Sequence, residues 1–144
     1  MKARVLSKLN GVTSSLVGIK ELQASVALLV RYTMAGEKHK LLCIYEYVAL
    51  DQSPSDIARK YSITPTKVRG YVQRFCAPLR YNTPLAKYVL TKTFGYLIEL
   101  PEVVVKTGGH YYCTICRKRV GGRRHAEKHP DILRERVEKV LELL

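Results

Sequence analysis

Two cysteines and two histidines near the C-terminal end constrain this chain more than any other feature of its sequence. Cys113 and Cys116 are separated by two residues, and His125 and His129 follow eight residues later with three residues between them. A two-residue spacing lets two thiolates wrap one metal ion, and histidines four apart lie on one face of a helix. Two thiolates and two imidazoles suit a tetrahedral Zn²⁺ ion. The spacing therefore predicts one zinc ion per chain, held by four protein ligands.

Other uses of these residues fit the pattern less well. A redox Cys-x-x-Cys motif does not call for a trailing histidine pair, and the remaining alternative is unliganded core residues. His110 could substitute as a ligand, but its spacing is poorer. Four cysteines in 144 residues do not form a disulfide scaffold, so we expect a cytoplasmic or nucleoid-associated protein. Cys43 and Cys76 are expected to be buried small apolar residues, and His39 to be solvated.

The cluster resembles a two-Cys, two-His zinc finger. Tyr111 to Cys113 would form a strand after a hairpin turn at Gly108-Gly109, and a short helix would hold both histidines. The common DNA-reading finger has about twelve residues between its two ligand pairs, so its base-reading positions cannot be transferred to this shorter segment. The segment is nevertheless basic and could bind phosphates or enter a minor groove; a structural role or a protein contact is the alternative. The DNA contacts predicted here are Arg117, Lys118, Arg119, Arg123 and Arg124.

Residues 54–75 predict two helices joined by a tight turn. Ser53 and Thr64 can each cap a helix, and each is followed by a proline that suits a first helical turn. Ala58 leaves room for two helices to cross near a right angle. The residues expected to face the core are Ile57, Ala58, Tyr61, Ile63, Val68, Tyr71, Val72 and Phe75.

This stretch resembles the helix-turn-helix family of DNA-binding domains, with Glu37 to Leu50 as the preceding support helix. In that family the second helix enters the major groove. Ser62 departs from the family, which often has glycine at this turn, and must adopt a left-handed or adapted conformation. The alternative is an ordinary pair of core helices. The resemblance implies base contacts by Thr66, Arg69, Gly70 and Gln73, and phosphate contacts by Lys67, Arg74 and Arg59.

The charge of the chain favours a polyanionic partner. Lys and Arg total 25 against 12 Asp and Glu, which gives a formal net charge of +13. We expect sequence-specific binding of double-stranded DNA by a transcriptional regulator. The alternatives are an RNA-binding or ribosome-associated protein, and a DNA-architectural or replication accessory factor. A helix-turn-helix beside a short zinc finger resembles small regulators from archaea and from archaeal plasmids and viruses.

Catalytic patterns do not stand out in the sequence. We find no glycine-rich nucleotide loop, no nucleophile elbow and no clustered carboxylates, so we expect neither an enzyme nor a small-molecule substrate. The longest candidate for a membrane span, Leu22 to Val30, is far shorter than the roughly 18 residues needed to cross a bilayer. A membrane partner is therefore not expected.

The predicted fold is mainly α with a small β component. A helix-turn-helix domain would be followed by a zinc finger, made of a β-hairpin and a short helix, and by an amphipathic C-terminal helix. Residues 85–100 are compatible with a helix or with two strands. The predicted segments are an N-terminal helical region (1–36), the helix-turn-helix domain (37–76), a connecting segment or wing (77–106), the finger (107–130) and the terminal helix (131–144).

The terminal helix raises the question of self-association. We expect Pro130 to keep His129 out of helical conformation and Asp131 to cap the helix that follows. An apolar stripe on this helix has the spacing of a coiled-coil seam, which would support a homodimer. Packing of the stripe on the core of its own chain is the alternative. The stripe consists of Leu133, Val137, Val140 and Leu144, broadened by Ile132 and Leu141.

Overall fold

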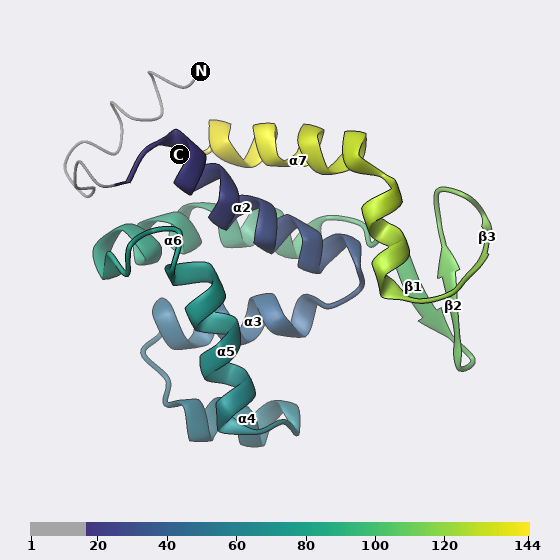
Figure 1. Ribbon diagram of the computed structural model, residues 1–144. Helices are drawn as coiled ribbons and strands as arrows, with labels where there is room; N and C mark the ends of the chain where they lie inside the picture. Colours follow the sequence, from purple (N-terminus) through teal and green to yellow (C-terminus); the bar gives the residue numbers. More distant parts are fainter. Residues whose placement is uncertain (1–16) are drawn as a thin grey trace.

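The computed structural model describes residues 17–144 and is mainly helical, with one three-stranded antiparallel sheet in the order β1-β2-β3 (Figure 1). This confirms the predicted fold class. Expectations for residues 1–16 lie outside the described part of the chain. The elements are α2 (Ile19–Met34), α3 (Lys38–Val48), α4 (Pro54–Tyr61), α5 (Pro65–Cys76), α6 (Thr83–Glu99), β1 (Val104–Thr107), β2 (His110–Cys113), β3 (Lys118–Val120), the 3₁₀ helix η1 (Arg123–Lys128) and α7 (Pro130–Glu142).

Helix α2 lies at the centre of the helical body and packs against α3, α5, α6 and α7 (Figure 1). Its apolar residues recur at helical spacing, so Val26, Leu29 and Val30 are fully buried on the faces that meet these neighbours. A buried hydroxyl adds a polar tie, because Ser25 Oγ donates to the carbonyl oxygen of Phe75 in α5 at 2.9 Å. The same apolar cluster continues to Cys113 and Ala126, so the C-terminal elements share the core of the helical body.

Gly36 ends α2 in a place that no other residue would fit without strain. Its φ of +74° lies in the left-handed region that glycine adopts freely, and the Glu37 amide donates to the Tyr32 carbonyl at 2.8 Å. A Cβ atom at Gly36 would lie 2.6 Å from the Val104 carbonyl oxygen. The end of α2 and the first strand can therefore approach each other closely.

Both helix caps predicted for α4 and α5 form. Ser53 Oγ accepts from the Asp56 amide at 3.1 Å, and Thr64 Oγ1 accepts from the Lys67 amide at 3.2 Å. Ser62 ends α4 with φ 56° and ψ 44°. This is the left-handed conformation expected at a turn position where glycine is more common. The core-facing residues of α5 are buried as predicted, while Tyr61 and Ile63 are half-buried against the same cluster.

Glu46 connects α3 to α4 through a nearly buried carboxylate. The side chain is buried, and its carboxylate accepts a short hydrogen bond from the Tyr61 hydroxyl and an ion pair from Lys60 at 3.0 Å. A charged group can stay in such a site only when it is paired and hydrogen-bonded. This network fixes the end of α4 against the support helix.

The predicted connecting segment contains a core helix. Residues 83–99 form α6, which buries Leu85, Val89 and Leu90 and stacks Phe94 on Tyr45 of α3 at 3.8 Å between ring centroids. A wing in this place is therefore not what the chain forms. Pro84 lies in the first helical turn, where proline is tolerated, and this explains why it does not interrupt the helix.

Helix α7 begins one residue earlier than its expected cap. His129 is the N-cap residue, with φ −119° and ψ 61°, and Pro130 starts the helix, so the expectation of an Asp131 cap is wrong. The non-helical His129 follows from the steric demand of the proline after it. The apolar stripe packs against α2 of the same chain and buries Val140, Leu141 and Leu144.

Across the part of the chain that the structure describes, we find no helix that combines the length and the apolar character needed to cross a membrane.

Candidate metal centre and nucleic-acid interface

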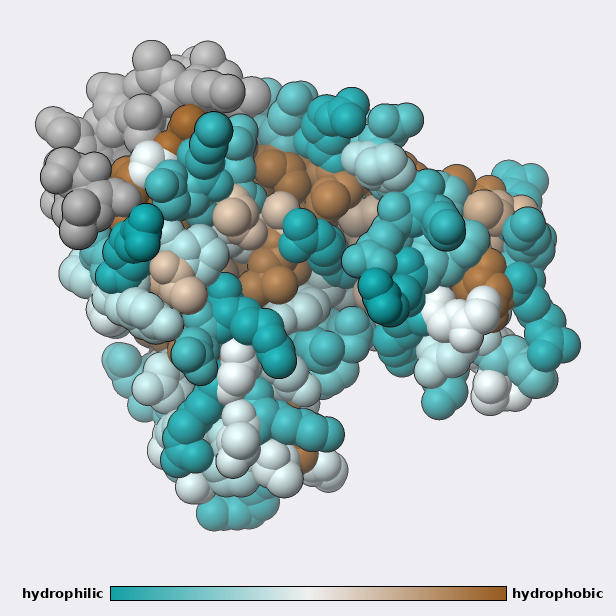
Figure 2. Space-filling view, viewed as in Figure 1, coloured by the Kyte–Doolittle hydropathy of each residue, from teal (hydrophilic) through white to brown (hydrophobic). Residues whose placement is uncertain are grey.

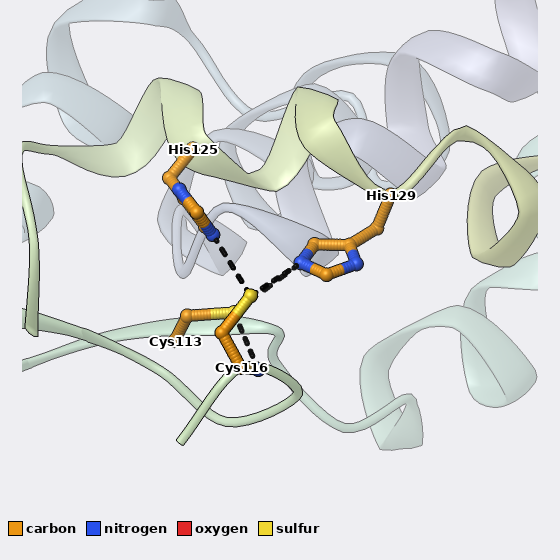
Figure 3. A group of neighbouring side chains, drawn as sticks. All are labelled: Cys113, Cys116, His125 and His129. Atoms are coloured by element: carbon orange, nitrogen blue, oxygen red, sulfur yellow. Dashed lines mark hydrogen bonds between the residues drawn. The ribbon is translucent and has the colours of Figure 1, made fainter. Parts of the chain in front are cut away.

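The four predicted metal ligands come together at one point. Cys113 ends β2, Cys116 lies in the knuckle that follows, His125 belongs to η1, and His129 lies between η1 and α7. Their side chains converge from two sides, with the histidines opposite the cysteines (Figure 3). One ligand atom from each residue lies within 4.8 Å of the other three. The four residues could therefore hold one metal ion.

Three sulfur–nitrogen distances in the cluster match the edge of a tetrahedral site. Cys113 Sγ lies 3.4 Å from His129 Nε2, and Cys116 Sγ lies 3.4 Å from His125 Nε2 and 3.5 Å from His129 Nε2. Bond lengths of about 2.3 Å to sulfur and 2.0 Å to nitrogen give a sulfur–nitrogen edge of about 3.5 Å in a tetrahedral site. The donor set and its spacing therefore fit Zn²⁺.

The local fold explains why these side chains meet. Gly108 and Gly109 both have positive φ, so a two-residue turn pairs Thr107 with His110 and starts β2. The knuckle closes when the Arg117 amide donates to the Cys113 carbonyl at 2.8 Å and Arg117 adopts φ 59°. The short helix predicted to hold both histidines is the 3₁₀ helix η1, which contains His125 and ends just before His129.

His110, the alternative ligand, lies outside the cluster. Its Nδ1 contacts Arg119 Nη2 at 2.7 Å.

Desolvation shifts the pKa values of two of the ligands, Cys116 and His125, in opposite directions. Desolvation first, and then the neighbouring Cys113 thiol, raise the pKa of Cys116. Desolvation, and then the neighbouring His129, lower the pKa of His125 and favour the neutral imidazole that binds metals. The Cys116 amide also donates to Cys113 Sγ at 3.3 Å.

The second candidate surface is the outer face of α5. Thr66, Lys67, Arg69 and Gln73 are all exposed. Gly70 lies between them, and a Cβ atom built there would meet nothing within 4 Å. This face therefore presents polar and basic side chains around a position that has no side chain.

Two of the residues predicted to contact phosphates, Arg74 and Arg59, interact with other side chains of the protein. The charge of Arg74 lies beside the Tyr32 phenol, whose pKa is raised by burial and lowered in part by Arg74. Arg59 lies 3.5 Å from Asp56, an exposed ion pair that costs little to exchange for a phosphate.

The basic residues of the finger unit, which we define as β1 to β3 with η1, fall into two groups. Arg117, Lys118, Arg119 and Arg124 are exposed. Arg123 is half-buried, donates to the Ala35 carbonyl at the end of α2 at 2.9 Å and lies over the Tyr111 ring. Arg123 therefore holds the finger unit to the helical body, and we leave it out of the proposed DNA contacts.

One contact near α5 was not predicted from the sequence. His39, expected to be solvated, is half-buried with its ring edge-on to Tyr71 of α5 at 6.3 Å. Its pKa is lowered by burial and by the nearby Lys40 and Arg123, against the effect of Glu37. Adjacent polar residues at the start of a helix gave no pattern that predicted this contact. Cys43 is buried as expected, and burial raises its pKa to about 11.

Comparison of the chain with protein-family models, with curated proteins and with solved structures finds no match.

Proposed function

We propose that this protein binds double-stranded DNA in a sequence-specific manner, with α5 in the major groove, and acts as a transcriptional regulator. The observation that carries the proposal is the exposed face of α5, where polar and basic side chains surround Gly70. The unit of α4 and α5 extends away from α2 and α7 (Figure 1). A duplex could therefore approach α5 without displacing another element among residues 17–144.

The chemistry of this face suits base edges. An arginine can bond guanine through two hydrogen bonds, a glutamine can do the same with adenine, and the threonine methyl group can contact thymine. Arg69, Gln73 and Thr66 would supply these contacts, and Gly70 would let the groove approach closely. Lys67 and Arg59 would contact phosphates, which position a protein but carry no sequence information.

We further propose that Cys113, Cys116, His125 and His129 hold one Zn²⁺ ion. A set of four protein ligands is typical of a structural site, whereas catalytic zinc keeps a position open for water or substrate. The three short strands bury few side chains, among them Val104 and Cys113. Metal binding would therefore supply much of the folding free energy of the finger unit, and we propose a binding role rather than an enzymatic one.

Selection from a random duplex library by the full-length, zinc-loaded protein tests the proposal. We expect one enriched sequence that outcompetes random duplex and structured RNA by at least about a thousandfold at physiological salt. If random duplex competed as well as the enriched sequence, the protein would bind DNA only non-specifically, and the proposal of sequence-specific binding would be wrong. Preferential competition by structured RNA would instead support the RNA-binding alternative.

A further inference from the structure

Ile115 is an apolar side chain in a place where neither the core nor the metal explains it. It lies at the tip of the knuckle between the ligands Cys113 and Cys116, and 51% of its surface is exposed. Isolated exposed apolar residues are common and need no explanation by themselves. Ile115 differs because of how its backbone is held and because of the charges around it.

The knuckle holds Ile115 in a fixed position. The Thr114 amide and hydroxyl both donate to the Val103 carbonyl, at 2.7 Å and 2.9 Å. The Cys116 amide donates to Cys113 Sγ on the other side of Ile115. Because both neighbours are bonded, little backbone entropy remains to be lost when the tip binds a partner.

The charge around Ile115 selects the class of that partner. From Val103 to Ala126 the chain has no Asp or Glu, and Glu102, just before this stretch, meets the knuckle through its carbonyl oxygen, which accepts from the Thr114 hydroxyl at 3.2 Å. Exposed cations follow the tip directly, and they would repel a basic partner but suit two lines of phosphates. These cations are Arg117, Lys118 and Arg119.

The finger unit is also fixed relative to α5. The Val103 amide donates to the Met34 carbonyl at 2.9 Å, and Arg123 donates to the Ala35 carbonyl. Figure 2 shows the unit of α4 and α5 (bottom) and the finger unit (right) as separate lobes with a hollow between them. A duplex held by one lobe is therefore presented to the other at a constant spacing.

We propose that Ile115 is a wedge that enters the minor groove of the duplex bound by α5, with Arg117, Lys118 and Arg119 on the flanking phosphates. Apolar side chains that insert between base steps unstack them and kink the duplex by roughly 20–90°. The protein would then bend its site as well as read it. This inference rests on the proposed function, because α5 holds the same duplex.

The test measures bending of the selected duplex, labelled at its two ends with a donor and an acceptor dye. Zinc-loaded wild-type protein should raise energy transfer between the ends. The Ile115→Ala variant should lose most of that rise and bind roughly tenfold more weakly, since the lost apolar contact is about one side chain. Ile115→Met, which keeps an apolar tip, should retain the bend.

Leu143→Ala is the matched control, because Leu143 is 42% exposed near the end of α7, away from the finger unit (Figure 1). It should bend the duplex like wild type. Elemental analysis must show the same zinc content in every variant, so that a lost knuckle is not mistaken for a lost wedge. A duplex that wild type binds without bending, or that Ile115→Ala bends fully, would overturn the inference alone. Failure of wild type to bind any duplex would overturn the proposed function.

Discussion

Arg69 and Lys67 are exposed neighbours on the first turns of α5, yet they should contribute to binding in different ways. Arg69→Ala should lose about 1–3 kcal/mol on the selected duplex and relax the preference at one base position. Lys67→Ala should weaken all duplexes alike and reduce the salt slope by about one. Titrations on selected and random duplexes at several salt concentrations measure both effects. Unchanged affinity and preference in Arg69→Ala would place α5 outside the major groove.

Arg134→Ala provides the control for these two variants. Arg134 is an arginine with a side chain 71% exposed, paired with Asp131 at 3.6 Å on α7. Helix α7 lies on the other side of α2 from α4 and α5 (Figure 1). Arg134→Ala should leave the preferred DNA sequence unchanged. It should change the affinity by no more than the general effect of removing one surface charge.

The phenol of Tyr61 should make stability depend on pH. Burial first, and then the bond to the Glu46 carboxylate, raise the pKa of Tyr61 well above its ordinary value. The folded state therefore keeps the phenol protonated, and this contribution is present below about pH 10 and is lost as the pH rises further. Tyr61→Phe should lower the free energy of unfolding by about 1–3 kcal/mol at pH 7 and flatten its fall at alkaline pH.

Urea unfolding at pH 7 and above pH 10 measures this, with Tyr47→Phe as the control. Tyr47 is 37% exposed, so its loss should cost little at either pH. If the two variants gave the same alkaline slope, the network between Tyr61 and Glu46 would not stabilise the fold.

At the level of elements, local chemistry predicted the ends of helices better than it predicted their surroundings. Ser53, Thr64 and Gly36 act over one turn of chain, and the structure places each cap or stop as expected. The turn at Gly108-Gly109 is local in the same way. Helix α6 could not be told from two strands, because its residues are apolar on most sides and its first-turn proline resembles a break.

The metal site was predictable for a related reason. Ligand spacing depends on the metal and not on distant packing, so Cys113, Cys116, His125 and His129 could be identified together. The role of Arg123 could not, because its partner is the carbonyl of Ala35, far away along the chain. A basic run in the sequence does not distinguish an arginine that faces solvent from one that holds two units together.

Metal removal should therefore unfold one unit and leave the other folded. With a chelator, amide hydrogen exchange should become fast in β1 to β3 and η1 while α3 and α5 stay protected, because most of the buried apolar residues of the shared core belong to the helices. Elemental analysis should find about one zinc per chain, and Cys116→Ser should lose it. Cys76→Ser, half-buried and outside the cluster, should keep it. Protected strands in a metal-free protein would contradict the assignment.

For the molecule as a whole, the sequence left open where the apolar stripe of α7 packs. The spacing of a coiled-coil seam and that of a helix packed on its own core differ little over so short a helix. The structure packs the stripe against α2 and joins the chain end to α6, where the Tyr88 hydroxyl donates to the Leu144 carbonyl at 3.1 Å. This arrangement leaves less of the stripe available for a second copy of the chain.

A chain that ends at Pro130 should therefore lose stability rather than change its oligomeric state. Val140, Leu141 and Leu144 are nearly or fully buried, and each contributes about 1.5–3 kcal/mol when removed from water. Leu141→Ala alone should cost about 2–5 kcal/mol, whereas Leu143→Ala, at a residue that is 42% exposed, should cost much less. Urea unfolding gives these differences, and light scattering gives the masses of the full and shortened chains.

The two measurements together separate intrachain packing from a dimer interface. If α7 stabilises its own chain, the urea midpoint of the full chain does not change with protein concentration, and both chains have the same number of subunits. If α7 instead joins two copies, the urea midpoint rises with protein concentration, because association stabilises the folded state. A dimeric full chain beside a shortened chain that stays folded as a monomer would show that the stripe belongs between subunits, and would also favour a palindromic DNA site.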